Sequence, residues 1–221
     1  MKITPVIEFG PELFRKETRD YPSFELEGDS YRKAREEFWY AMLADWGIID
    51  INPFAKGSEF VALSDISDQT LDILIDRELA ISEVTEKINP DEVSSLCGGI
   101  IFESGSHIIE PSCCGALSDF IEWEDLARSP VGKVKQVWIG HPWIDVAGVD
   151  NDKMKLSMHR EQSSELVFEF IISQAELLPQ IEKAGHELNA FNDRVKSELR
   201  RKSYPIELAS ALTGVENKKA K

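Results

Sequence analysis

Three cysteines and one histidine lie close together in the chain, and their side chains are the first candidates for chemistry. Cys97, His107, Cys113 and Cys114 offer four thiolate or imidazole ligands around one predicted β-hairpin. Four such ligands are enough for a tetrahedral zinc ion. However, the Cys-x-x-Cys spacing of structural zinc sites is absent, and adjacent cysteines seldom direct both sulfurs at one ion. A zinc site is therefore an alternative hypothesis for this stretch.

The adjacent pair Cys113 and Cys114 could also supply a thiol nucleophile. Such a thiol needs an imidazole base, and His141 or His159 could fill that role. No motif places a histidine beside the pair, and free cysteine is among the most buried residue types. A disulfide between neighbours would strain the peptide unit, because consecutive α-carbons lie only about 3.8 Å apart. We therefore expect the pair to fill small pockets beside Gly115, without a catalytic role.

Carboxylates and a large aromatic side chain follow the cysteine pair. One interpretation is a short, solvated helix, in which Ser118 or Asp119 caps the first turn and Glu122 completes a capping box. The other interpretation is an anionic patch with an aromatic anchor for a basic protein partner. Both stay open, and the second assigns partner binding to Asp119, Glu122, Trp123, Glu124 and Asp125.

A second aromatic stretch, WIGHPWIDV, places His141 between Trp138 and Trp143 at the junction of two expected strands. The histidine is either a turn residue or a polar contact in a cleft walled by aromatic rings. We favour the turn, and keep His141 and Trp143 in the predicted partner-binding set. The chain contains no phosphate-binding loop, nucleophile elbow or dinucleotide fingerprint. No reaction can be assigned from motifs.

Periodicity predicts a mixture of helices and strands. Apolar residues at helical spacing, with capping residues or glycines nearby, indicate helices, and runs of β-branched and aromatic residues between turn signals indicate strands. The expected helices cover residues 29–47, 67–80, 117–128 and 176–202; the expected strands cover 3–9, 59–63, a hairpin within 98–111, 134–140, 143–149, 154–158 and 165–171. Short connections predict an antiparallel meander. The fold class is α+β: a mostly antiparallel sheet flanked by helices, with the long C-terminal helix packed on it.

Prolines and glycines refine the boundaries of these elements. Residues 11–28 include Pro11, Pro22 and Gly28, and we predict a loop there. Pro179 would remove a backbone hydrogen bond inside a helix, so we expect the last helix to begin near Leu178.

Composition indicates one globular domain over residues 1–221, with a frayed tail at 214–221. The net charge of −15 and the pI of about 4.7 argue against nucleic acid and against membrane surfaces as partners. No apolar run is long enough to span a bilayer, and no secretory signal is recognisable. The chain also has three cysteines, an odd number that does not suggest a disulfide framework. These features predict a cytoplasmic protein, and we expect it to need no cofactor.

The stretches EPSCCGALSDFIEWEDL and VWIGHPWIDV resemble a pattern found in small uncharacterised bacterial proteins, some of which resemble immunity proteins of polymorphic toxin systems. In size, acidity and mixed helix and sheet content the chain is also similar to immunity proteins of the SMI1/KNR4 type. The resemblance implies a non-catalytic protein that neutralises a basic toxin by stoichiometric binding. It assigns no role to individual residues.

Overall fold

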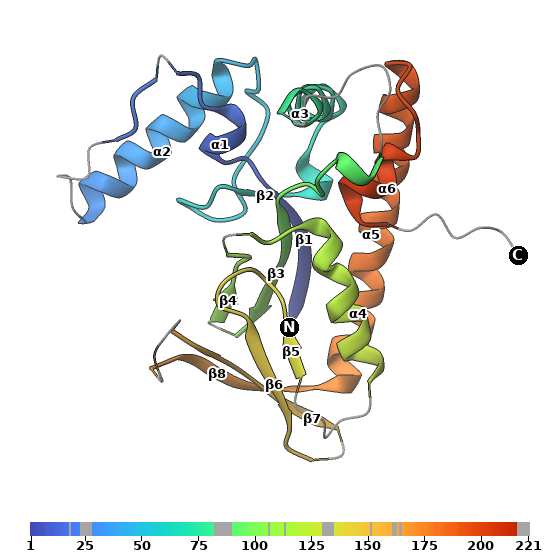
Figure 1. The fold of residues 1–221 in the computed structure, drawn as a ribbon. Coiled ribbons are helices and arrows are strands. Elements are labelled where there is room, and N and C mark those ends of the chain that lie inside the picture. Colours follow the sequence, from blue (N-terminus) through green and yellow to red (C-terminus); the bar gives the residue numbers. More distant parts are fainter. Residues whose placement is uncertain are drawn as a thin grey trace, which may run out of the picture.

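The computed structural model shows an α+β fold and describes residues 1–17, 19–22, 28–81, 90–105, 107–112, 114–129, 135–150, 152–160, 163 and 165–215. The strands form two four-stranded antiparallel sheets, and one long helix runs beside them (Figure 1). The predicted fold class is confirmed, and the structure adds that the strands divide between two sheets.

The first sheet has the strand order β2-β1-β3-β4. It consists of β1 (Lys2–Glu8), β2 (Phe60–Ala62), β3 (Gly98–Ser104) and β4 (His107–Ile109). Strand β1 lies between β2 and β3 and is buried along its middle, as expected for a run of apolar residues covered on both faces. Strands β3 and β4 form the predicted hairpin.

The second sheet is the predicted meander, in the order β5-β6-β7-β8. Its strands are β5 (Lys135–Val137), β6 (Ile144–Gly148), β7 (Lys153–His159) and β8 (Leu166–Ser173). Alternate residues of β6 are buried, and so are Met154, Leu156 and Met158 at alternate positions of β7, so one face of this sheet packs into the core.

Six α-helices and three short 3-10 turns are present in the described part of the chain. The helices predicted from periodicity correspond to α2, α3, α4 and α5, whereas α1 occupies a segment predicted to be loop. That helix is a single turn begun by a proline, too short for periodicity to reveal. The helices are α1 (Pro11–Phe14), α2 (Gly28–Ala44), α3 (Asp68–Ile81), α4 (Phe120–Arg128), α5 (Gln174–Arg201) and α6 (Leu208–Thr213); the 3-10 turns are η1 (Leu63–Asp65), η2 (Pro90–Glu92) and η3 (Leu117–Asp119).

Helix α5 packs along β1 and also contacts α3, α4 and α6 (Figure 1). It begins at Gln174 instead of near Leu178, because the Ser173 side chain caps it by accepting a hydrogen bond from the Ala175 amide at 3.2 Å. Pro179 therefore lies inside the helix. The predicted packing of the C-terminal helix on the sheet is confirmed.

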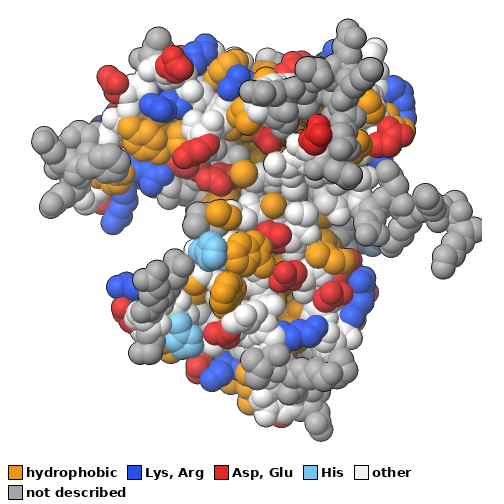
Figure 2. All heavy atoms as spheres, viewed as in Figure 1, with side chains coloured by type: hydrophobic (Ala, Val, Ile, Leu, Met, Phe, Trp, Pro, Cys, Tyr) orange, Lys and Arg blue, Asp and Glu red, His pale blue; other side chains and the backbone are white. Residues whose placement is uncertain are grey.

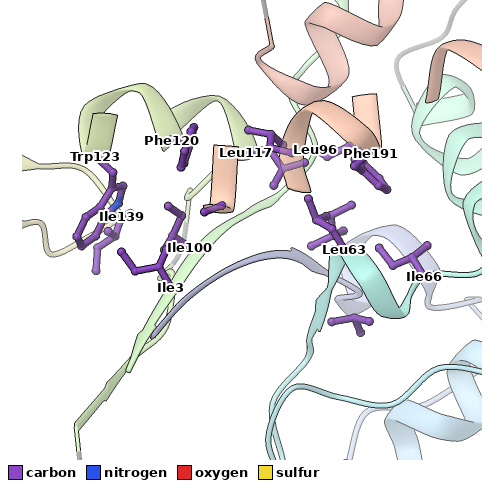
Figure 3. Packing of buried hydrophobic residues seen from close by; sticks show 14 of the residues in the cluster. Ile3, Leu63, Ile66, Leu96, Ile100, Leu117, Phe120, Trp123, Ile139 and Phe191 are labelled. Carbon is purple, nitrogen blue, oxygen red and sulfur yellow. The ribbon is translucent and has the colours of Figure 1, made fainter. Parts of the chain in front are cut away.

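The buried apolar residues form one cluster that joins both sheets to the helices. Figure 3 shows Ile3 and Ile100 of the first sheet beside Phe120 and Trp123 of α4, with Phe191 of α5 further along the same core. No helix in the described ranges is long and apolar enough to cross a bilayer. Of the predicted frayed tail, residue 214 ends α6 in a left-handed conformation, and residues 216–221 lie outside the description.

Candidate functional site

A pocket of about 530 Å³ lies where the end of β1 meets α1, α3 and the chain before β3. Its apolar lining includes Ile7, Leu13, Leu74 and Leu96. These side chains are brought together because α1 follows β1 directly and α3 packs against α1. The volume falls within the range of about 300–1,000 Å³ that is typical of small-ligand sites.

Four glutamates supply most of the polar lining of this pocket, which we call the acidic pocket. They come from separate segments: Glu8 ends β1, Glu12 lies in α1, Glu59 precedes β2 and Glu78 lies in α3. No lysine or arginine is among the described lining residues. Only Glu59 has a cationic partner among the described side chains, the guanidinium of Arg35. The pocket therefore carries uncompensated negative charge.

Burial and mutual repulsion make this negative charge costly. The pKa of Glu8 is raised above its usual value first by burial, and then by the charges of Glu59 and Glu12. Burial alone raises the pKa of Glu78. A cation placed between these carboxylates would relieve both effects.

The walls of the acidic pocket are held by contacts between its elements. Arg77 of α3 donates to the Leu13 carbonyl of α1 at 3.0 Å, and its guanidinium lies 4.1 Å from the ring centre of Trp46. The Trp46 indole in turn donates to the Phe14 carbonyl at 2.6 Å. These contacts link α1 to α3 and so hold two walls of the pocket together.

The pocket also contains two of the three cysteines. Cys97 and Cys114 are both free and exposed at its edge, so the expectation that Cys114 is buried packing material is wrong. Cys114 lies in a left-handed turn with φ 68°, and the close backbone packing falls instead to Gly115, where an added Cβ would lie 2.8 Å from the Gly98 carbonyl oxygen. Cys113 lies outside the described residues.

The electrostatic environment of Cys97 opposes thiolate chemistry. Although part of Cys97 is exposed at the edge of the pocket, desolvation of its thiol by the surrounding protein raises its pKa, and the charges of Glu78 and Glu8 raise it further. One of the two candidate bases, His159, faces Asp145 on the neighbouring strand at 3.7 Å. A neutral thiol surrounded by carboxylates is a weak nucleophile.

Two residues of the zinc hypothesis, Cys97 and His107, lie far apart. Cys97 precedes the first residue of β3, whereas His107 pairs with the last, Ser104. Seven strand residues separate them, or about 23 Å along the strand. The His107 ring stacks on Phe170 instead, with centroids 5.7 Å apart. Among the residues with described positions, no group of three or more His, Cys, Asp or Glu side chains is arranged to hold a metal ion.

The predicted acidic patch also needs correction, because Trp123 is a core residue. Its side chain is 1% exposed and stacks on Phe102 with centroids 6.0 Å apart. The buried residues of α4 recur at helical spacing, so the Trp123 indole faces the core while Asp125 is exposed. Trp123 therefore cannot serve as an exposed anchor for a partner.

The carboxylates of this patch have different surroundings. Asp119 accepts a hydrogen bond from the Ala116 amide at 2.8 Å, and burial raises its pKa. Glu122 accepts one from the Trp138 amide at 2.6 Å. Both therefore help to hold the local fold. Of the other two, Glu124 pairs with Arg128 at 3.2 Å, and Asp125 is exposed.

A cluster of aromatic rings that is partly exposed lies after β5, where His141 and Trp143 are exposed and Trp138 is half-buried. Trp138, His141 and Trp143 lie with ring centroids 4.7 to 6.1 Å apart, and we call them the aromatic patch. The Trp138 indole donates to the Cys114 carbonyl at 3.4 Å, so this patch adjoins the edge of the acidic pocket. On the face in Figure 2, hydrophobic side chains gather beside a histidine on the lower part of the molecule, below acidic side chains of the upper part.

Sequence reasoning identified the aromatic patch in part but missed the acidic pocket. One signal for the pocket was present: Glu78 follows Leu71 by seven residues and Leu74 by four, so it occupies the apolar face of its helix. A carboxylate on such a face is seldom there for solubility.

Replacing Glu78 with glutamine should raise the melting temperature by a few degrees at pH 7. Because the folded-state pKa lies above the usual 4.5, the folded protein binds protons more tightly than the unfolded chain does, and stability falls as pH rises from 4.5 through the folded pKa. Well below pH 4.5 the carboxyl is protonated in both states, and the substitution should have little effect. Thermal unfolding at both pH values tests this, with the exposed Glu17→Gln as control; equal shifts in the two variants would contradict it.

Comparison with protein-family models, with curated proteins and with solved structures finds no match, so a functional proposal for this chain depends on the acidic pocket and the aromatic patch.

Proposed function

We propose that this chain is a non-catalytic binding protein whose partner is a basic protein. The observation that carries the proposal is a glutamate-lined pocket without described basic lining residues, next to a partly exposed aromatic patch. Carboxylates can pair with a basic partner, and tryptophan is enriched among the residues that anchor protein interfaces. The net charge of −15 would accelerate encounter with such a partner.

The aromatic patch is suited to binding because part of it is already fixed. The Trp138 amide donates to Glu122 and its indole donates to the Cys114 carbonyl. A side chain held in this way loses less conformational freedom when a partner covers it. Trp138 thus takes the anchoring role that the sequence assigned to Trp123, and Asp125 stays as an exposed carboxylate of α4.

The resemblance to immunity proteins favours a bacterial toxin as the partner, neutralised one-to-one in the cytoplasm. Stoichiometric binding needs no cofactor and no nucleophile. The thiol-dependent alternative gains no support from Cys97, since its raised pKa keeps the thiol neutral.

The proposal is tested by purifying this chain with the product of an adjacent reading frame. We expect a one-to-one complex whose association rate constant falls at least about tenfold between low salt and 0.5 M salt, since steering by opposite charges is screened. Light scattering gives the stoichiometry, and stopped-flow fluorescence gives the rate. An association rate that ionic strength leaves unchanged would contradict the electrostatic argument.

Replacing Trp138 and Trp143 with alanine should weaken that complex by about a hundredfold or more, because anchoring tryptophans often contribute about 2 kcal/mol each. The matched control is Ile171→Ala, which removes an exposed apolar side chain from β8. Titration calorimetry measures both dissociation constants. If the two variants lost the same affinity, the aromatic patch would have no special role.

A further inference from the structure

The acidic pocket combines two kinds of lining that are seldom found together in one cavity. Ile7, Leu13 and Leu74 form an apolar wall, while Glu8 and Glu78 approach from β1 and α3. Within the described part of the chain, neither carboxylate pairs with a lysine or arginine, whereas Glu59 pairs with Arg35. The cavity therefore offers hydrophobic surface and unmet negative charge to the same occupant.

This lining excludes most classes of ligand. An anion would be repelled by the glutamates, and a neutral apolar molecule would bury their charge without compensation. The described side chains form no group able to hold a metal ion. What fits both linings is a cation on an alkyl chain, since its methylene groups can cover apolar surface while its charged end pairs with carboxylates.

We propose that the acidic pocket binds an alkylguanidinium or alkylammonium group, with its methylene chain against Ile7, Leu13 and Leu74 and its charged end between Glu8 and Glu78. The group could come from a free small cation or from an arginine or lysine of a protein partner. In the second form the inference rests on the proposed function and names what that partner inserts.

Proton linkage supports this assignment. The carboxyls of Glu8 and Glu78 have raised pKa values, so an entering cation would displace bound protons and affinity would increase from pH 5 to pH 8. The ionisable groups that face them are Glu12 of α1, Glu59 with its partner Arg35, Tyr21, Cys97 and Cys114. Of these, the charges of Glu12 and Glu59 raise the pKa of Glu8, as burial does.

The test uses agmatine, a four-carbon chain with a guanidinium at one end and an ammonium at the other, with putrescine as the diammonium analogue and butanol as a neutral four-carbon probe. Titration calorimetry on the full chain should show saturable binding of agmatine, none of butanol, and at least a tenfold loss of affinity in Glu8→Gln/Glu78→Gln. The control Glu17→Gln/Glu207→Gln removes the same charge from exposed positions and should bind as the wild type does. Equal losses in both double variants would overturn the proposal, because bulk charge alone would then explain binding.

A second set of measurements distinguishes a free small cation from an arginine or lysine side chain of a protein partner. If agmatine fails to bind but Glu8→Gln/Glu78→Gln weakens the complex with the basic protein, the occupant is a side chain of that protein. If agmatine does not bind and the double variant leaves the complex unchanged, the pocket proposal is wrong, while the aromatic patch can still bind a partner. If agmatine binds and no basic protein does, the proposed function is wrong and the pocket is a small-cation site. Melting temperatures of all variants establish that each is folded.

Discussion

Replacing Gly98 with alanine is expected to lower the free energy of unfolding by about 4 kcal/mol or more, or to prevent folding. Gly98 has φ +149°, which L-residues rarely adopt, and it pairs with Ile7 of β1. An added Cβ would lie 2.2 Å from the Val6 carbonyl oxygen and 2.9 Å from the Ile7 α-carbon. Both are backbone atoms of the central strand, so they cannot move without separating β1 from β3. The acidic pocket would be lost as well, since Ile7 and Cys97 both line it.

The matched control is Gly57→Ala. Gly57 also has a positive φ, +82°, but nothing lies within 4 Å of an added Cβ. It should cost only about 1–2 kcal/mol, the strain of the left-handed conformation itself. Urea unfolding followed by circular dichroism measures both variants. Equal destabilisation would mean that the contact between β1 and β3 is not as close as described.

Replacing Trp123 with alanine is expected to lower the free energy of unfolding by about 3–5 kcal/mol, because it leaves a large cavity between α4 and β3. The indole is 1% exposed and stacked on Phe102. The control is Ile121→Ala on the same helix, where the side chain is 55% exposed and the loss should stay below about 0.5 kcal/mol. If both variants lost a similarly small amount of unfolding free energy, Trp123 would not be a core residue, and the sequence-based prediction of an exposed anchor would stand.

The regular elements of this fold could be predicted because their patterns are local. The buried residues of α5, from Leu177 to Leu199, repeat at steps of three and four, which indicates a helix. Short connections between the later strands indicate the meander of the second sheet. Division of the strands into two sheets has no local signature, because it depends on which buried faces meet. Stacking of Phe102 on Phe170 joins the sheets across a long stretch of sequence.

The functional surfaces were harder to predict, and for physical reasons. A tryptophan among carboxylates has the composition of an interface anchor, and only the phase of α4 against the core shows that Trp123 points inward. The acidic pocket draws Glu8, Glu59, Glu78 and Cys97 from four separate segments with no spacing motif. Their proximity follows from the pairing of β1 with β2 and β3 and from the packing of α3.

The most direct test of the central claim is a nuclear magnetic resonance titration of the isotope-labelled chain with agmatine, followed through backbone amide shifts. If the acidic pocket is the cation site, shifts will concentrate at its lining, at Gly10, Leu13, Ile81 and Cys97, and will follow one binding curve. They will disappear in Glu8→Gln/Glu78→Gln. Shifts spread over exposed acids of α2 and α5, or no shifts at millimolar agmatine, would contradict the claim that this pocket recognises a cationic group.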